Sequence, residues 1–282
     1  MGNPKFALPS LESLLESKHE VKAIVSNPAK PMDRKRVLKH TDVGSYSLQN
    51  NIELIELDSF NNDTIYKKLL SLNVDIFVVV AFRILPEKYI SIPKFGSINL
   101  HASLLPSYRG AAPIQWALMN GDKTTGVSVF QIEKKVDTGK IITQAKIDID
   151  KNDNYEILSN KLSKVGAGAL VEALNNLEEG EVDYNKQDKS LVTKAPKISK
   201  EMLRIQWDWP AAKINNWVRG LSPKPGMVAI FQNKRTRILK TLVLDDKMKR
   251  APGKIKAATN SSLEIYTGRG LISILELQQE GK

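Results

Sequence analysis

The residues best suited to chemistry lie in one predicted strand and one predicted turn. Asn99 and His101 are separated by a single residue, and side chains alternate along a strand, so both would point the same way. An Asn amide can donate a hydrogen bond to a developing oxyanion, and a His can take or give a proton near neutral pH. Asp137 precedes Thr138 and Gly139 in a turn sequence. If it lies close to His101, it could orient the imidazole, keep it cationic, or bind a water that carries a proton.

Each of these residues also has a simpler explanation. A single His at a strand end is more often structural than catalytic, and an Asp before Thr-Gly is usually a turn former. Asn99 alone carries no information, and the run from Ser103 to Pro106 fits a plain loop. Spacing alone therefore gives only a weak prediction of an active site.

The elements that must position these residues alternate along the first part of the chain. Apolar periodicity predicts strands at 20–26, 52–57, 74–81 and 97–101, and helices at 7–17, 63–72 and 111–120. This order favours a doubly wound, mostly parallel sheet covered by helices on both faces, whose ligands bind at the carboxyl ends of the strands. Strands at 125–133 and 140–149 flank the Asp137 turn, and residues 155–177 predict a long amphipathic helix. Residues 27–39 predict a basic loop interrupted by Pro.

The pattern changes after a polar linker predicted at residues 181–200. Residues 211–221 predict a helix, and five short strands are expected at 227–232, 236–243, 254–258, 263–266 and 271–277. Short strands separated by Gly, Pro and Asn suggest a small barrel of the oligonucleotide-binding (OB) type. We therefore divide the chain into an α/β domain at 1–180, a linker at 181–200 and an OB-like β-barrel domain at 201–282.

Composition narrows the class of protein. The 282 residues carry a formal charge of +11, and they include no Cys and only three His, which excludes disulfides and thiolate metal sites. No apolar run is long enough for a membrane span, so we expect a cytoplasmic protein. Residues 200–282 hold 16 basic and 7 acidic side chains, whereas the first 199 hold 26 and 24. A basic segment joined to a nearly neutral one suggests a polyanionic partner, and nucleic acid is the default candidate.

Four motifs together resemble the 10-formyltetrahydrofolate-dependent formyltransferase superfamily: Asn99-x-His101, Ser103-Leu104-Leu105-Pro106, Arg109-Gly110-x-Ala112-Pro113-Ile114 and Asp137-Thr138-Gly139. The resemblance implies a Rossmann-like catalytic domain with Asn99, His101 and Asp137 as the catalytic residues, and no metal. It also implies 10-formyltetrahydrofolate as the formyl donor. The residues expected to contact this folate are Phe82, Arg83, Ile84, Leu85, Ser103, Leu104, Leu105, Pro106, Val136, Thr138 and Gly139.

Other motifs resemble the members of the superfamily that formylate methionyl-initiator tRNA for translation initiation. They are the opening Gly2-Asn3-Pro4-Lys5-Phe6-Ala7, the basic loop at 27–39, Arg204-Ile205-x-Trp207 and Arg219-Gly220-x-Ser222-Pro223-x-Pro225-Gly226. The resemblance implies that methionyl-initiator tRNA is the partner, and we expect a monomer that does not bind membranes. The residues expected to contact tRNA are Lys30, Arg34, Lys35, Arg36, Lys234, Arg235 and Arg237.

The sequence departs from the family pattern at three places. The chain begins at Met1-Gly2, where the family has an earlier apolar strand, so we expect that this strand is missing and that Met1 is an internal Met of a longer chain. The loop from Ala81 to Pro86 is one residue short, and the chain stops about twenty residues early. Two alternatives stay open: formyl transfer to a nucleotide-sugar or purine-precursor acceptor, or folate hydrolysis, on the same domain, and a truncated, non-catalytic RNA-binding remnant.

Overall fold

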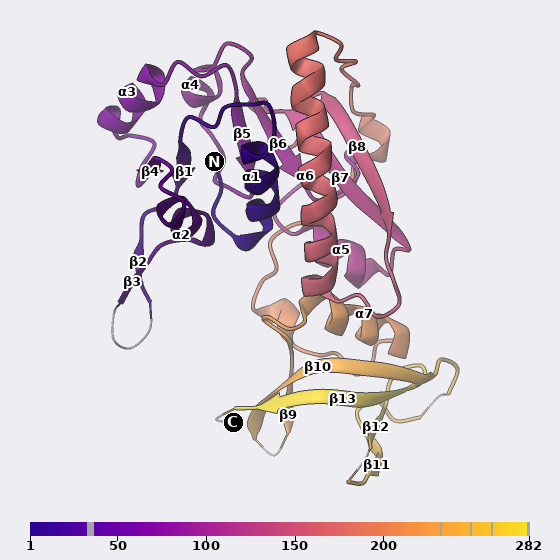
Figure 1. Ribbon diagram of the computed structural model, residues 1–282. Helices are drawn as coiled ribbons and strands as arrows, with labels where there is room; N and C mark the ends of the chain where they lie inside the picture. Colours follow the sequence, from indigo (N-terminus) through magenta and orange to yellow (C-terminus); the bar gives the residue numbers. More distant parts are fainter. Residues whose placement is uncertain (33–36, 232, 249, 261, 281–282) are drawn as a thin grey trace. The chain divides into compact units, whose positions relative to one another are not determined.

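The computed structural model describes residues 1–32, 37–231, 233–248, 250–260 and 262–280 (Figure 1). Its contacts divide the chain into two compact units. The first unit comprises residues 1–109, 126–147 and 160–194, and the second comprises residues 110–125, 148–159 and 195–282. The predicted tRNA contacts Arg34, Lys35 and Arg36 lie outside the described residues.

Parallel strands form the centre of the first unit. β1 (Ile24–Ser26) pairs with β4 (Leu54–Glu56) in parallel. A second sheet has the order β5 (Phe77–Val80), β6 (Ser97–His101), β7 (Thr124–Gln131), β8 (Ile141–Asp148). β5 and β6 are parallel, and β6 and β7 are antiparallel. The carboxyl ends of β5 and β6 therefore lie at the same edge, as the sequence predicts for the site.

The start of the chain connects the two sheets. The Gly2 amide donates to the Val25 carbonyl oxygen of β1 at 3.0 Å, and Gly2 forms a parallel bridge with Val80 of β5. The Met1 amino group donates to the Val78 carbonyl oxygen at 2.6 Å. Burial lowers the pKa of this amino group from 8.0 to about 5, because a charged amine loses its hydration there.

The helices of the first unit cover these strands (Figure 1). They are α1 (Leu8–Leu15), α2 (Asp42–Gln49), α3 (Asp63–Ser71), α4 (Glu87–Ile90) and most of α6 (Tyr155–Glu179), with a short 3-10 turn at each of Lys5–Ala7 and Lys189–Leu191. One core cluster contains Val25, Ile55, Leu57, Leu69, Phe77, Val79, Leu85 and Tyr89. Gly166 lets α6 approach β6, since an added Cβ would lie 2.7 Å from the Leu100 side chain.

The second unit joins a small helical layer to an antiparallel sheet. α5 (Pro113–Asn120) and α7 (Ala211–Leu221) contact each other, and a 3-10 turn lies at Glu201–Leu203. Five strands follow in the order β11 (Ile255–Ala258), β12 (Leu263–Tyr266), β13 (Leu271–Gln279), β10 (Lys234–Asp245), β9 (Met227–Phe231). Its core contains Met119, Ile205, Ile214, Val218, Leu221, Met227, Ile238, Ile265, Ile272 and Ile274.

The predicted class of fold, an α/β domain followed by a small β domain, is confirmed, and several local elements, among them the short helix α4, differ from prediction. Residues 27–39 were predicted as a loop, but they include two short strands, β2 (Lys30–Met32) and β3 (Val37–Lys39), which pair antiparallel. α2 was not predicted, because its sequence lacks a clear apolar period; Thr41 caps it by accepting from the Gly44 amide. Within the described ranges, no helix has the length and apolar character needed to cross a membrane.

Candidate active site

Asn99 and His101 occupy the carboxyl end of β6. Ile98 and Leu100, which alternate with them, are buried, and Leu100 packs on the α6 side of the strand. Asn99 and His101 therefore point to the opposite face, as the predicted alternation requires. Asn99 is half-buried, and its side chain has no hydrogen-bond partner in the described part of the chain. Its amide N–H groups are available to a ligand.

The His101 imidazole is nearly buried and has a defined orientation. Its side chain is 7% exposed, and Nε2 lies 2.9 Å from the Tyr108 carbonyl oxygen. Because a carbonyl oxygen only accepts, Nε2 carries the proton in this contact. The ring also packs edge-to-face against Phe130, with centroids 6.5 Å apart. Nδ1 is left to face the carboxylate of Asp137.

Asp137 is the third predicted residue, and the fold brings it to His101. Asp137 Oδ2 lies 4.0 Å from His101 Nδ1, and the Asp137 side chain is 11% exposed. This distance exceeds that of a direct hydrogen bond. Asp137 has a φ of 54°, in the left-handed region that Asp tolerates better than most residues. Two positions on, only Gly139 fits, since a Cβ there would lie 1.7 Å from the Gln131 carbonyl oxygen.

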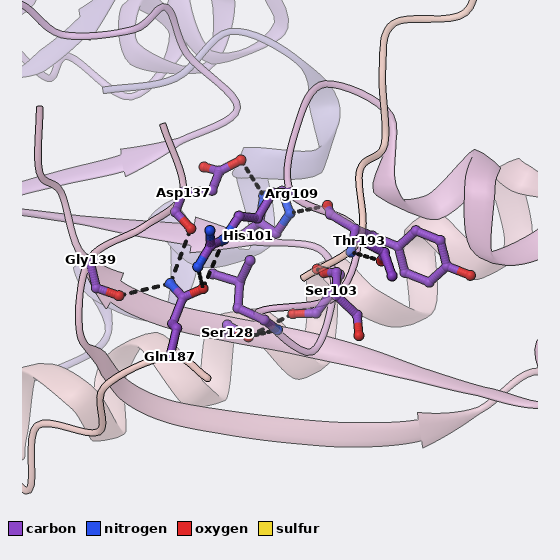
Figure 2. Close-up of polar contacts among 11 residues, drawn as sticks. His101, Ser103, Arg109, Ser128, Asp137, Gly139, Gln187 and Thr193 are labelled. Atoms are coloured by element: carbon purple, nitrogen blue, oxygen red, sulfur yellow. Dashed lines mark hydrogen bonds and ion pairs between the residues drawn. The ribbon is translucent and has the colours of Figure 1, made fainter. Parts of the chain in front are cut away.

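A hydrogen-bonded loop follows β6. Ser103 Oγ donates to the Ser107 carbonyl oxygen at 2.6 Å, and Ser128 Oγ donates to the Ser103 carbonyl oxygen at 2.7 Å. The Leu105 amide donates to Ser128 Oγ at 2.9 Å, and Gln144 Nε2 donates to the Leu105 carbonyl oxygen at 3.0 Å. These bonds hold the loop beside His101 (Figure 2).

The structure separates the predicted folate contacts into buried and accessible residues. The side chains of Leu85, Ser103 and Leu105 are buried in the protein. Ile84 and Val136 are 71% and 49% exposed, so two apolar side chains are available for a ligand ring. Gly139 is also buried. The remaining predicted contacts are partly buried: Phe82, Arg83, Leu104, Pro106 and Thr138.

Arg83 has protein partners that the sequence did not reveal. Its guanidinium donates to the Asp58 carbonyl oxygen at 3.0 Å and to the Leu57 carbonyl oxygen. The same group lies over the rings of Phe60 and Phe82, at 4.7 Å and 5.3 Å from their centroids. Arg83 therefore anchors the loop after β5 to the segment after β4.

Sequence reasoning missed several residues that hold the site. The Arg109 guanidinium donates to Gln187 Oε1, and the Tyr108 amide donates to Thr193 Oγ1 at 2.8 Å. Gln187 and Thr193 belong to the polar segment interpreted as a linker, which has no apolar period to mark its contacts. Arg109 was recognised only as part of a motif, without a role.

The basic residues predicted to contact tRNA differ in exposure and in their hydrogen bonds within the protein. Lys30 is exposed on β2, and Lys234 and Arg235 are exposed at the start of β10. Arg237 is only half-exposed, and its guanidinium donates to the Pro225 carbonyl oxygen at 2.8 Å, the Pro223 carbonyl oxygen at 2.5 Å and Gln278 Oε1 at 2.6 Å. Arg237 thus supports the loop that follows α7.

Fold and site together define a class of protein: an α/β protein with a His–Asp pair beside the carboxyl end of a parallel strand, where ligands bind in sheets of this kind. The sequence profile of the formyl transferase family matches residues 1–174, and that of the formyl transferase C-terminal domain matches residues 197–282. Methionyl-tRNA formyltransferase of Thermodesulfovibrio yellowstonii is 42% identical over 282 residues, covering 100% of this chain and 90% of that protein. The enzyme of the same name from Caldanaerobacter subterraneus subsp. tengcongensis is 39% identical over 283 residues, covering 100% and 91%. The chain belongs to the methionyl-tRNA formyltransferase family.

Solved structures share the fold at lower identity. An N-formyltransferase from Helicobacter canadensis, solved with folinic acid and dTDP-3-aminofucose, has a TM-score of 0.72 at 19% identity over 99% of this chain and 97% of that one. The sugar formyltransferase WlaRD has a TM-score of 0.71 at 21% identity, covering 100% and 96%. HypX from Aquifex aeolicus, solved with tetrahydrofolic acid, has a TM-score of 0.63 at 18% identity, covering 83% and 41%.

Proposed function

We propose that this chain transfers a formyl group from 10-formyltetrahydrofolate to the amino group of methionyl-initiator tRNA, in the cytoplasm, for translation initiation. The observation that carries the proposal is the His101–Asp137 pair at the end of β6, in a chain that matches methionyl-tRNA formyltransferases over its full length. The exposed cations Lys30, Lys234 and Arg235 support a polyanionic acceptor.

The reaction joins two groups at the carboxyl edge of β5 and β6. The neutral methionyl amine attacks the formyl carbon and forms a tetrahedral intermediate, whose oxygen carries the negative charge. The amide of Asn99 donates to that oxyanion, and His101 stabilises the same charge. The bond from the formyl carbon to N10 of the folate then breaks, the amine loses one proton and N10 gains one. Groups of this kind each contribute about 10²–10⁴-fold.

The proton moves along the His101–Asp137 pair. Nε2 of His101 is held by the Tyr108 carbonyl oxygen, so Nδ1 is the nitrogen that takes and returns the proton. Asp137 faces Nδ1 at 4.0 Å, and a water or a small movement of the turn completes the path. The buried surroundings strengthen the attraction between the carboxylate and a cationic imidazole.

The folate would lie over the ends of β5 and β6. Ile84 and Val136 offer exposed apolar surface for its ring system, and the Ser103–Ser107 loop offers fixed backbone groups. The exposed side chains of Lys30, Lys234 and Arg235 supply positive charge that attracts the phosphates of the acceptor.

The direct test is formyl transfer from 10-formyltetrahydrofolate to methionyl-initiator tRNA, with uncharged tRNA, a purine precursor and a nucleotide-linked amino sugar as parallel acceptors. We expect formyl-methionyl-tRNA alone. Product only with a small acceptor would replace tRNA by that acceptor, and folate hydrolysis without transfer would identify a hydrolase. Binding of tRNA without binding of any folate would support a non-catalytic RNA-binding protein.

A further inference from the structure

Gln187 connects the turn that carries Asp137 to the loop that follows His101. Gln187 Nε2 donates to the Asp137 carbonyl oxygen at 3.1 Å and to the Gly139 carbonyl oxygen at 2.8 Å. Gln187 Oε1 accepts from Arg109 Nε at 3.0 Å and from Arg109 Nη2 at 2.6 Å. Figure 2 shows the Gln187 amide between these two partners, beside His101.

We propose that Gln187 is a positioning residue for the formyl transfer proposed above, on which this inference rests. Its amide fixes the 137–139 turn against Arg109, and this sets the approach of the Asp137 carboxylate to His101 Nδ1. Gln187 does not touch the reacting atoms. It acts through Asp137, whose distance to the imidazole decides how readily the proton moves.

Every hydrogen-bond donor and acceptor of the Gln187 side-chain amide has a partner. A Gln amide has two N–H donors and one oxygen with two lone pairs. The two donors go to carbonyl oxygens, which only accept, and the oxygen receives two N–H groups of a guanidinium, which only donates. The orientation of the amide is therefore determined by its partners, and neither Glu nor a shorter side chain can reproduce it.

The turn needs such support. Asp137 adopts a left-handed backbone conformation, and Gly139 lies where no Cβ fits. A non-Gly residue with positive φ persists when its surroundings hold it. The Gln187 amide binds the carbonyl oxygens of both Asp137 and Gly139, so it closes over the strained part of the turn.

The segment that carries Gln187 is itself attached to the site. The Arg109 amide donates to the Thr193 carbonyl oxygen at 3.0 Å, and the Tyr108 amide donates to Thr193 Oγ1 at 2.8 Å. Asn185 forms a bridge with Ile141 at the start of β8. Gln187 lies between these attachment points, so its side chain is presented to the turn by backbone contacts on both sides.

The test compares Gln187→Ala with Gln187→Glu in the formyl transfer assay. We expect Gln187→Ala to lower kcat by about 10–100-fold, because a misplaced group near the chemistry costs a factor of this size. The KM for tRNA should stay within about twofold, since ground-state binding is unaffected. Gln187→Glu keeps the acceptor for Arg109 but loses both donors, so we expect it to be no more active than Gln187→Ala.

A spectroscopic measurement supplies a readout that needs no substrate. The chain has only three His, so the ring signals of His19, His40 and His101 can be assigned in a ¹⁵N NMR spectrum. We expect Gln187→Ala to shift the His101 signals and leave those of His19 and His40, which bond to Asn175 and Glu56, in place. Gln131→Ala is the matched control, because it removes another half-buried Gln amide, one that contacts Tyr184 and not the turn.

Three results would overturn the proposal. The first is an unchanged kcat in Gln187→Ala. The second is a Gln187→Glu variant as active as the unaltered chain. The third is a general effect of Gln187→Ala, in which the melting temperature falls and the ring signals of all three His shift together. If the unaltered chain transfers no formyl group to methionyl-tRNA, the proposed function fails, and the NMR comparison still decides the role of Gln187. His101 signals that move on their own would support it, and unmoved signals would reject it.

Discussion

Around the carboxyl end of β6 the side chains of His101 and Asp137 are nearly buried, whereas at the start of β10 the cations Lys234 and Arg235 face solvent. His101 and Asp137 are 7% and 11% exposed, and the surrounding loops are tied by bonds from Gln187 and Ser128. Lys234, by contrast, is an exposed residue at the start of β10. Proton transfer depends on distances of a few tenths of an ångström, but attraction to a polyanion acts over about 10 Å in 0.1 M salt. The first region therefore buries its titratable groups, whereas the second exposes its cations to solvent.

The largest effect should come from removing the imidazole at the held site. We expect His101→Ala to lower kcat by about 10²–10⁴-fold with nearly unchanged affinity for tRNA, because the group acts on the reacting atoms and not on the acceptor's phosphates. Single-turnover kinetics and tRNA binding measure the two quantities. His19→Ala is the matched control, and a near-normal rate in His101→Ala would end the assignment.

The comparison predicts a different result for a basic residue that the second unit holds in place. Arg219 donates to the carbonyl oxygens of Asp150, Lys151 and Asp153 at 3.0–3.2 Å, and to Asn216 Oδ1 at 3.0 Å. We expect Arg219→Ala to lower the free energy of unfolding by about 2 kcal/mol, because the Asp153 carbonyl oxygen, in a partly buried contact, loses its donor. Urea unfolding followed by circular dichroism tests this. An unchanged free energy of unfolding would show that the hydrogen bonds of Arg219 do not stabilise the fold.

The pH dependence of the rate should follow the acceptor amine. Only the neutral amine attacks, and α-amino groups have an ordinary pKa of about 7.7–8.0. Protonation removes the reactive form as the pH falls, so kcat/KM should drop about tenfold per unit well below that pKa. We expect the rate to rise from pH 6 to pH 8.5 when chemistry limits it, and a flat profile over that range would contradict the mechanism.

The smallest effect per residue should come from the exposed cations. We expect the double variant Lys234→Ala and Arg235→Ala to weaken tRNA binding and to reduce the salt dependence of log K by about 1–2, without loss of stability or kcat. We expect Arg237→Ala to lower the stability and to leave tRNA binding nearly unchanged, because its guanidinium donates to the carbonyl oxygens of Pro223 and Pro225. Equal behaviour of the two variants would remove the distinction between held and exposed cations in the second unit.

Much of the fold and part of the site could be predicted from local patterns. Alternation along residues 97–101 placed Asn99 and His101 on one face, and the strands on either side of the 137–139 turn were found as β7 and β8. α2 was missed because Ser and Gly interrupt its apolar spacing. The roles of Asn99, His101 and Asp137 remain predictions that the variants above test.

The polar segment at 181–200 shows where local patterns stop being informative. It has few apolar anchors and was interpreted as a linker, yet Gln187 and Thr193 bond to the turn and loop that carry the site. Such contacts join residues about 50 to 85 positions apart, through backbone carbonyl and amide groups that leave no mark on the sequence. The same limit applies to Arg237, which belongs to a basic cluster but bonds to a loop.

The amino-acid sequence by itself determined the succession of strands and helices, the strand-end placement of Asn99 and His101, and the basic character of the C-terminal part. These properties depend on residue type and on spacing over a few positions. Only the tertiary structure decided that Asp137 faces His101 Nδ1, that Gln187 donates to the carbonyl oxygen of Asp137, and that Arg237 bonds to the loop after α7. Those relations depend on which distant segments the folded chain brings within hydrogen-bond distance, and a side chain's type does not specify its partner.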